Sequence, residues 1–208
     1  MTQLNNYRSA YTLPVMEQFY TVQGEGYYQG HAAYFIRLGG CDVGCVWCDV
    51  KESWDAAAHP LLDVTSLANT AAESGTRIAV ITGGEPAMYD LSVLTSALQN
   101  KGIRTHIETS GAYPLTGSWD WICLSPKKFK RPDASVPPLA HELKAIVYNQ
   151  SDFAWAEEFA ALVPPSCQLF LQPEWSREKD MLPAVISYVK ANPQWQISLQ
   201  IHKYMNFP

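Results

Sequence analysis

Three cysteines lie within a stretch of eight residues, at Cys41, Cys45 and Cys48, in the spacing C-x3-C-x2-C. The apolar, β-prone residues 33–38 predict a buried strand, and Gly39 and Gly40 predict that it ends in a loop. Three thiolates on one loop can converge on a metal centre. Iron–sulfur clusters favour cysteine thiolates, and a cubane [4Fe–4S] cluster needs four ligands. Three cysteines therefore leave one iron open to chelate a small molecule.

A structural zinc site is the alternative for the same cysteines, and it would need four protein ligands in a closed site. His31 and His59 are the nearest candidates for a fourth ligand, and neither has zinc-finger spacing to the cysteines. A disulfide requires an oxidising compartment. The chain has no apolar signal core at its start and no run of about 20 apolar residues that could span a membrane. We therefore expect a cytoplasmic protein with reduced thiols and no membrane partner.

Length and composition predict a single packed domain over residues 1–208. Of the 208 residues, 47% are hydrophobic and 12% aromatic. Residues 1–14 are expected to form a loosely ordered leader. The net charge of −5 and the lack of a long basic run argue against nucleic acid as a direct partner. The most basic segment, residues 127–131, better suits an anionic or nucleotide-like ligand.

Strand, loop and helix recur roughly every 25–30 residues, which is the size of a βα unit. Strands are predicted at 15–22, 33–38, 77–82, 103–108, 119–124, 142–147, 168–171 and 196–202. Helices are predicted at 65–73, 91–101, 152–162 and 178–190. Such units form a mostly parallel sheet with right-handed crossovers. There are too few for a complete eight-stranded barrel, so the expected fold is α/β, a partial β/α barrel with its functional loops at the carboxyl ends of the strands.

Polar side chains at these strand ends are the further candidates for chemistry. Glycines in the segment Thr82-Gly-Gly-Glu-Pro86 allow close approach of the backbone to a ligand. Lys127 can supply a point charge to a carboxylate. Arg37 lies inside an apolar strand, where an unpaired charge is costly. Its partner is either a carboxylate of the barrel, such as Glu108, in a salt bridge, or the carboxylate of a substrate, bound through two nitrogens of the guanidinium.

The cysteine spacing after a first strand resembles that of the radical S-adenosylmethionine (SAM) enzymes. The wider pattern resembles the 7-carboxy-7-deazaguanine synthases of the queuosine pathway, and it runs in that family's order from about residue 17 to the end of the chain. The matching stretches are 23–26, 35–38, 47–49, 81–86, 107–111, 125–127, 142–144, 171–173 and 202–204.

The resemblance implies the cofactors, the reaction and the partners. The amino and carboxylate groups of SAM would chelate the open iron, and SAM would be reused. The substrate would be 6-carboxy-5,6,7,8-tetrahydropterin, a small-molecule pterin, and the product 7-carboxy-7-deazaguanine, formed with loss of ammonia. A flavodoxin-type electron donor and a homodimer are also implied. Two alternatives are a glycyl-radical activase, which shares the cysteine spacing, and a non-catalytic iron–sulfur or zinc sensor, which has no use for the loops around residues 84 and 126.

The resemblance also assigns the site residues. Those expected to contact SAM are Trp47, Cys48, Asp49, Gly84, Glu85, Ser125, Pro126, Lys127, Gln172, Pro173, Glu174 and Trp175. Those expected to contact the substrate are Val22, Gln23, Gly24, Glu25, Arg37, Thr82, Glu108, His202 and Pro208. His202 is expected to end the last strand, and Trp175 serves equally well as a packing residue. His106 and His141 are expected to be structural.

One position departs from the family pattern. The family reads Trp-Cys-Asp-Thr at the cysteine loop, where the threonine hydroxyl helps to hold Mg²⁺ beside the substrate, and this chain has Val50 instead. Mg²⁺ needs oxygen ligands, and a valine side chain offers none. Either the ion is lost, or a water replaces the hydroxyl, or Asp49, Glu52 or Ser53 supplies the ligand. We expect activity to depend weakly or not at all on Mg²⁺.

Overall fold

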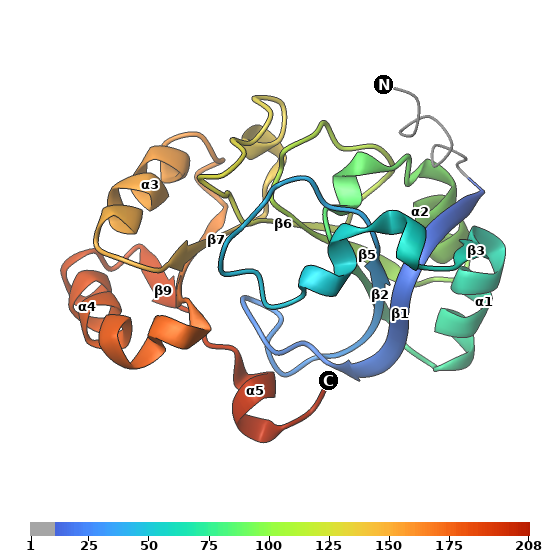
Figure 1. Cartoon of the computed structure of the whole chain (residues 1–208), viewed down its shortest axis with the longest axis horizontal. Helices are drawn as coiled ribbons and strands as arrows, with labels where there is room; N and C mark the ends of the chain where they lie inside the picture. Colours follow the sequence, from blue (N-terminus) through green and yellow to red (C-terminus); the bar gives the residue numbers. More distant parts are fainter. Residues whose placement is uncertain (1–10) are drawn as a thin grey trace.

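The computed structural model describes residues 11–208, which form one curved sheet of nine strands in the order β3-β1-β2-β4-β5-β6-β7-β8-β9 (Figure 1). The strands are β1 Thr12–Val22, β2 Ala32–Leu38, β3 Leu61–Asp63, β4 Ile78–Gly83, β5 Arg104–Thr109, β6 Trp121–Leu124, β7 Glu142–Val147, β8 Gln168–Pro173 and β9 Trp195–Ile197. Every pair from β2 to β9 is parallel, and β1 is antiparallel to both neighbours. The two edge strands do not pair with each other, so the prediction of an open, mostly parallel barrel is confirmed.

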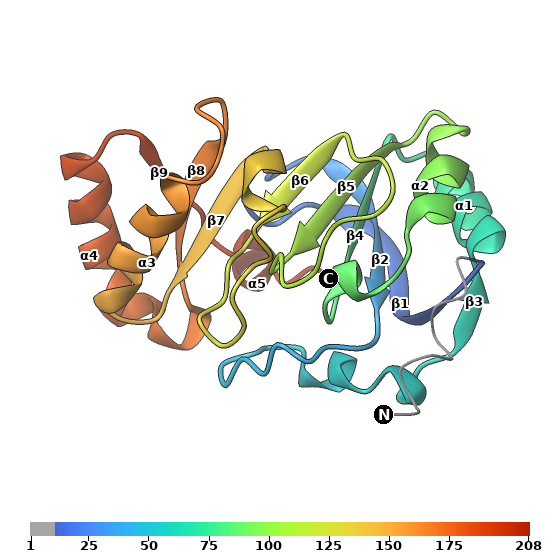
Figure 2. The ribbon, with the colours of Figure 1, turned by 90° about the horizontal axis from the view of Figure 1, so that it is seen from above.

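The main helices pack on the outer, convex face of the sheet (Figure 1). They are α1 Val64–Glu73, α2 Ser92–Gln99, α3 Ser151–Ala160 and α4 Glu178–Ala191. One apolar cluster joins α1 and α2 to β1, β2, β4 and β5, and a second joins α3 and α4 to the strands from β6 to β9. The two pairs of helices therefore cover the two halves of the sheet, as seen from above in Figure 2.

Alternation along the strands puts one set of apolar side chains against the helices, and on the concave face the polar side chains at the strand ends follow a smaller apolar cluster that includes Phe35 and Val80. On β2, the fully buried Ile36 and Leu38 belong to the apolar cluster under the helices, whereas Arg37 points the other way. On the next strand, Ile81 joins the same cluster and Thr82 pairs in register with Arg37. This period of two is the physical reason that the concave face can carry a polar site.

Two parts of the chain differ from the predicted elements near its start. Leu13 is fully buried in the apolar core, and residues 12–14 pair with the short strand β3, which was not predicted. The last three residues of the predicted leader are therefore part of β1. Residues 1–10 of the leader lie outside the described residues. β3 has only three residues, too few for a periodic signal in the sequence.

The predicted last strand, 196–202, is wrong beyond Ile197. β9 Trp195–Ile197 is short, and a helix, α5 Ile201–Met205, follows it. Ser198 still donates to Leu171 on β8, but Ile201 donates to the carbonyl of Gly24 at the opposite side of the cavity. An edge strand has a partner on one side only, so these contacts with the turn after β1 direct the chain away from the sheet.

Candidate active site

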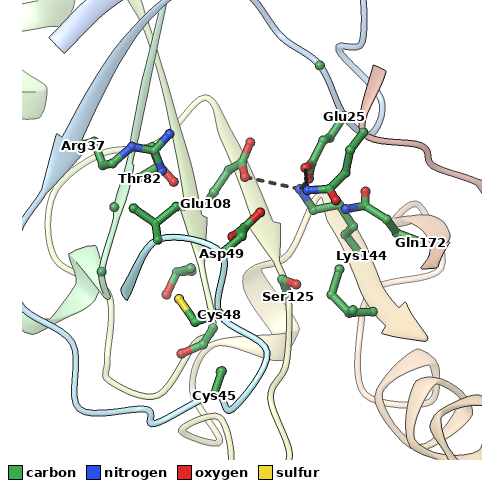
Figure 3. Close-up of a pocket in the computed structure, with 18 of the residues that line it drawn as sticks. Glu25, Arg37, Cys45, Cys48, Asp49, Thr82, Glu108, Ser125, Lys144 and Gln172 are labelled. Carbon is green, nitrogen blue, oxygen red and sulfur yellow. Dashed lines mark hydrogen bonds and ion pairs between the residues drawn. The ribbon is translucent and has the colours of Figure 1, made fainter. Parts of the chain in front are cut away.

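One large cavity, of about 460 Å³, opens on the concave face at the carboxyl ends of the parallel strands (Figure 3). All three clustered cysteines line it, together with polar side chains from five strands and from the C-terminal segment. Most of the residues expected to contact SAM or substrate are also in its walls, among them Val22, Gln172, Glu174 and Pro208, and so is Val50, the position discussed for Mg²⁺. Two expected residues, Pro126 and Pro173, are absent from the walls. The topology thus gathers residues that are 187 positions apart, as in the hydrogen bond from Thr21 Oγ1 to the Pro208 carbonyl.

The cysteine loop is held by its backbone. Gly40 and Cys41 donate to the carbonyls of Ser53 and Trp54, at 2.6 and 3.1 Å. Gly40 has a φ of +100°, which favours glycine. All three cysteines are free thiols. Burial raises the pKa of Cys45 to about 11, against the lowering influence of the Lys127 charge, so a metal centre must displace its proton on binding.

The three thiols fit an iron–sulfur cluster better than a zinc ion. Within residues 11–208, no three side chains of the His, Cys, Asp and Glu types lie close enough to share a single metal ion. A closed zinc site requires four such ligands on one atom. A cluster instead takes one thiolate on each of several irons, which is what a loop of three separated thiols in one cavity wall can offer.

The glycine-rich segment after β4 packs directly on the cysteine loop. Gly84 donates to Leu38 and Glu85 donates to the Gly40 carbonyl, at 2.9 and 2.8 Å. A side chain on Gly84 would clash with Gly40 and with the Cys41 side chain. The absence of a Cβ therefore lets this segment lie against the loop, as expected for a backbone that approaches a ligand.

Glu85 has a structural role besides the expected contact with SAM. Its side chain is 1% exposed and accepts hydrogen bonds from the Ala87 and Ser110 amides, at 3.0 and 2.8 Å. The hydroxyls of Thr109 and Ser110 also donate to it. Both carboxylate oxygens are thus occupied, and the residue ties the end of β4 to the end of β5.

The Ser-Pro-Lys segment after β6 brings a cation to the same wall. Lys127 Nζ donates to the Ser125 carbonyl at 2.7 Å and lies 5.8 Å from the centre of the Trp47 ring. Burial lowers the pKa of Lys127. Pro126 lies behind this wall, where its carbonyl accepts from the Trp155 indole at 3.3 Å.

A network of charged side chains around the buried Lys144 lies across the cavity from the cysteines (Figure 3). We call it the charged network and define it as Gln23, Glu25, Glu108, Lys144 and Gln200. Lys144 Nζ lies 2.5 Å from Glu25 Oε2 and 3.2 Å from Glu108 Oε2. The side-chain amides of Gln23 and Gln200 donate to the outer oxygens of Glu108 and Glu25, at 2.7 and 2.8 Å.

Lys144 fixes the charge of this network. Burial alone would raise the pKa of Glu25, but the charge and hydrogen bond of Lys144 bring it down to about 2. Burial likewise opposes the charge on Lys144, but Glu108 and Glu25 raise its pKa well above the ordinary value. Glu25 is therefore ionised and Lys144 is protonated at neutral pH, and Glu108 supplies the second carboxyl group in contact with Lys144. Both carboxylates are also walls of the cavity.

Lys144 belongs to the site although no role for it was predicted from the sequence. The signal was present, because a lysine lies inside the apolar strand predicted at 142–147, and Arg37 was singled out for that reason. Only the fold shows that the partners of Lys144 come from β5 and from the turn after β1. Arg37 itself pairs with Glu17, at 2.6 Å, in place of the alternative Glu108. It still lines the cavity beside Thr82 (Figure 3).

The C-terminal segment closes one side of the cavity. His202 lies on α5 and packs against Gly24, where any side chain would clash with the imidazole. Burial lowers the pKa of His202, so the ring is neutral at neutral pH. Lys203 pairs with Asp49 on the cysteine loop at 2.8 Å and lies 5.1 Å from the centre of the Trp175 ring. Trp175 is 41% exposed and takes part in both the cavity wall and this packing.

Comparisons with known proteins identify the family. Residues 35–124 match the model of the radical SAM superfamily. The 7-carboxy-7-deazaguanine synthase of Flavobacterium psychrophilum is 57% identical over 196 residues, which cover 94% of this chain and 93% of that protein. The chain belongs to the 7-carboxy-7-deazaguanine synthase family. The Synechocystis enzyme of the same name is 50% identical over 192 residues, covering 92% of each chain.

The fold comparison agrees with this family. The crystal structure of QueE from Escherichia coli superimposes with a TM-score of 0.82 at 30% identity, and covers 96% of this chain and 98% of that one. Membership in the 7-carboxy-7-deazaguanine synthase family confirms the predicted radical SAM enzyme and its partial barrel. A radical SAM enzyme uses an iron–sulfur cluster and SAM, so the zinc sensor is disfavoured. No helix among residues 11–208 has the length and apolar character to cross a bilayer.

Proposed function

We propose that this enzyme converts 6-carboxy-5,6,7,8-tetrahydropterin to 7-carboxy-7-deazaguanine with loss of ammonia, in the 7-deazapurine pathway that leads to queuosine. The observation that carries the proposal is the arrangement of a three-cysteine loop and a buried charged network on opposite walls of one cavity. The wall with the three cysteines suits an iron–sulfur cluster and SAM, which together generate a radical. The other suits a flat, hydrogen-bonding heterocycle. A glycyl-radical activase acts on a protein and needs no such enclosed network.

The cofactor wall would hold the cluster on Cys41, Cys45 and Cys48. When bound, the cluster and SAM supply a 5′-deoxyadenosyl radical that removes a hydrogen atom from the substrate. The chain's own part is to orient SAM. Gly84 lets the backbone approach the methionine end, and Lys127 offers a cation to its carboxylate. Trp47, Asp49, Gln172, Glu174 and Trp175 complete the pocket around the rest of the molecule.

The substrate wall would orient the pterin. Its amino group and ring N–H groups are donors, and the carboxyl oxygens of Glu25 and Glu108 are acceptors; Lys144 keeps Glu25 ionised and lies 3.2 Å from Glu108. At the other end, the substrate carboxylate would meet the Arg37 guanidinium, whose Nε is already held by Glu17. Thr82, next to Arg37 in register, adds a hydroxyl. The neutral His202 can donate or accept one hydrogen bond.

The metal requirement and the partners form a second part of the proposal. Val50 lines the cavity and has no oxygen in its side chain. Of the three side chains considered as substitutes, Asp49 is a cavity wall, whereas Glu52 and Ser53 are not. Asp49 is already paired with Lys203. We therefore propose that Mg²⁺ has little or no role, that a flavodoxin-type protein donates the electron, and that the enzyme acts in the cytoplasm as a homodimer.

An anaerobic assay tests the reaction. The reconstituted enzyme is mixed with SAM, a one-electron reductant and 6-carboxy-5,6,7,8-tetrahydropterin, and products are followed by mass spectrometry and by ammonia release. We expect 7-carboxy-7-deazaguanine and one ammonia per substrate consumed. A Glu108→Gln variant should bind SAM normally and lose most of this activity. Cleavage of SAM without any pterin-derived product would exclude the proposed substrate.

A further inference from the structure

A second, much smaller cavity adjoins the charged network. The space open to the centre of a water molecule is about 10 Å³, close to the room that one water needs. It shares Gln23, Glu25 and Glu108 with the large cavity. Its other walls are Tyr28, Val80, His106, Ile107, Trp121, Cys123 and Glu142. Most of these walls carry polar atoms, whereas cavities that stay dry are apolar.

His106 presents a buried nitrogen to this cavity. The residue is on β5, is 3% exposed, and its ring centre lies 4.5 Å from that of Tyr28. Among residues 11–208, no group forms a hydrogen bond with its Nε2, which is the single side-chain nitrogen or oxygen there that is fully buried and unpaired. Burial lowers the pKa of His106 to about 4, with a smaller contribution from Arg104. The neutral ring is polar at Nε2 and needs a partner.

Glu142 lines the same cavity, and the hydrogen bonds to its carboxyl group from Trp121 and Tyr27 reach one oxygen. Its Oε2 accepts from the Trp121 indole at 3.0 Å and from the Tyr27 amide at 3.3 Å. Its Oε1 lies beside Gly26, which has no side chain at this position. Burial raises the pKa of Glu142, which makes a further hydrogen-bond partner for this carboxyl group more valuable.

We propose that one buried water occupies the second cavity and joins His106 Nε2 to Glu142, which makes His106 a positioning residue for the turn at residues 23–26. The polar walls and the size of the cavity suit a single water with two or more partners. Glu142 holds the amide of Tyr27, directly after this turn. Gln23 and Glu25 on the turn reach Glu108 and Lys144 in the charged network. By holding Glu142 in place, the water would stabilise the turn at residues 23–26 and, through it, the position of the charged network.

The water site does not depend on the proposed substrate and is tested first by crystallography. A well-ordered structure of the natural protein should show density for one water within hydrogen-bonding distance of His106 Nε2 and of a Glu142 oxygen. A cavity without density in such a structure would overturn the proposal.

The sign of a stability change gives a second test. His106→Phe removes the partner of the water and leaves Glu142 less satisfied, so the melting temperature should fall by about 3 °C. His106→Gln, which keeps a polar end, should recover part of the loss. If the cavity were dry, His106→Phe would remove an unpaired nitrogen and raise the melting temperature. An unchanged or higher value would refute the water, and His31→Phe, at an exposed histidine, serves as the matched control.

The positioning role rests on the proposed function and has its own readout. In His106→Phe, the KM for the carboxytetrahydropterin should rise about fivefold, equivalent to ~1 kcal/mol, while SAM binding is unchanged. His106→Gln should restore part of the KM. A lower melting temperature with an unchanged KM would keep the water and reject the positioning role. If the natural enzyme makes no pterin product, the proposed function fails, and the density and melting temperature still decide the water.

Discussion

The two walls of the cavity are held in place by different kinds of interaction. Around the cysteine loop, Asp42 pairs with Lys130 at 2.7 Å, with the two side chains 48% and 33% exposed. Asp49, which is 56% exposed, pairs with Lys203. Across the cavity, Lys144 is 4% exposed and lies between two carboxylates of the charged network. The ion pairs around the cysteine loop are exposed, whereas those of the charged network centre on the buried Lys144.

The difference matches what each wall must do. Exposed ion pairs contribute about 0–1 kcal/mol and are screened by salt. The exposed pairs therefore add little to the backbone hydrogen bonds that hold the cysteine loop, and their side chains can move at little cost when a cluster and SAM bind. Breaking a buried pair leaves an uncompensated charge and costs far more. The substrate wall is therefore preformed, with its acceptors fixed before the ligand arrives.

The largest expected effect is on the cysteine wall and concerns activity alone. Replacing Cys41, Cys45 or Cys48 by Ala should reduce SAM cleavage to background. Three thiolates would hold three of the four irons, and a cluster that loses one of these ligands is no longer held in place. Folding should be little changed, since the loop is held by its backbone. Cys167→Ala is the matched control, because Cys167 and Cys45 are both 8% exposed, and it should retain activity. Deoxyadenosine formation by all three variants would contradict the assignment.

The next largest effect is on the substrate wall and concerns stability. Lys144→Met leaves Glu25 and Glu108 without their shared cation, and should lower the free energy of unfolding by about 3–5 kcal/mol. Urea unfolding measures this change. Lys190→Met, at an exposed position on α4, should change the same quantity by less than about 0.5 kcal/mol. A loss below about 1 kcal/mol in Lys144→Met would mean that the two walls are held equally weakly.

Acid titration sharpens the same contrast. The pKa of Glu25 is about 2 in the folded chain, below its ordinary value of 4.5. A lowered folded-state pKa contributes stability that is present above pH 4.5 and is lost as the pH falls toward 2. Chemical denaturation between pH 6 and 2 should show this decline in the natural protein. The decline should be smaller in Lys144→Met, because the lysine is what lowers the pKa.

Much of this arrangement could be predicted from the sequence. The apolar, β-prone residues 33–38 and the run 142–147 predicted two strands that the structure contains, and the three clustered cysteines predicted a loop that lines the cavity. The charged network could not be predicted, because its partners lie on β5, on β7 and in two turns far apart in sequence. His202 was assigned to the cavity by resemblance, but its helix was missed. An apolar residue such as Ile201 fits a strand or a short helix equally well.

A smaller effect is expected at the surface ion pair between Lys203 on α5 and Asp49 on the cysteine loop. Lys203→Met removes the partner of Asp49 and should raise the dissociation constant for SAM about two- to threefold, with little change in melting temperature. The difference between variant and natural protein should shrink in high salt, because the pair is exposed. A salt-independent difference would show that the pair is shielded, contrary to the comparison.

The smallest expected effect concerns Mg²⁺. Activity of the chelator-treated enzyme should change little when Mg²⁺ is added back, since Val50 provides no oxygen ligand. Val50→Thr restores a hydroxyl at this position and should make the rate respond to Mg²⁺. A steep requirement in the natural enzyme that Val50→Thr leaves unchanged would show that the ion binds elsewhere.

The contacts between residues 21–26 and the C-terminal segment have a consequence for how the chain folds. From β4 onward, neighbouring strands in the sheet are also neighbours in sequence, so this part can assemble by local steps. The hydrogen bonds from Ile201 to Gly24 and from Gln200 to Glu25 instead join residues more than 170 positions apart. Closing so long a loop is entropically costly and is favourable only once the sheet between its ends exists. The substrate wall is therefore expected to form last. During folding, most of the sheet would be assembled before the cavity is complete.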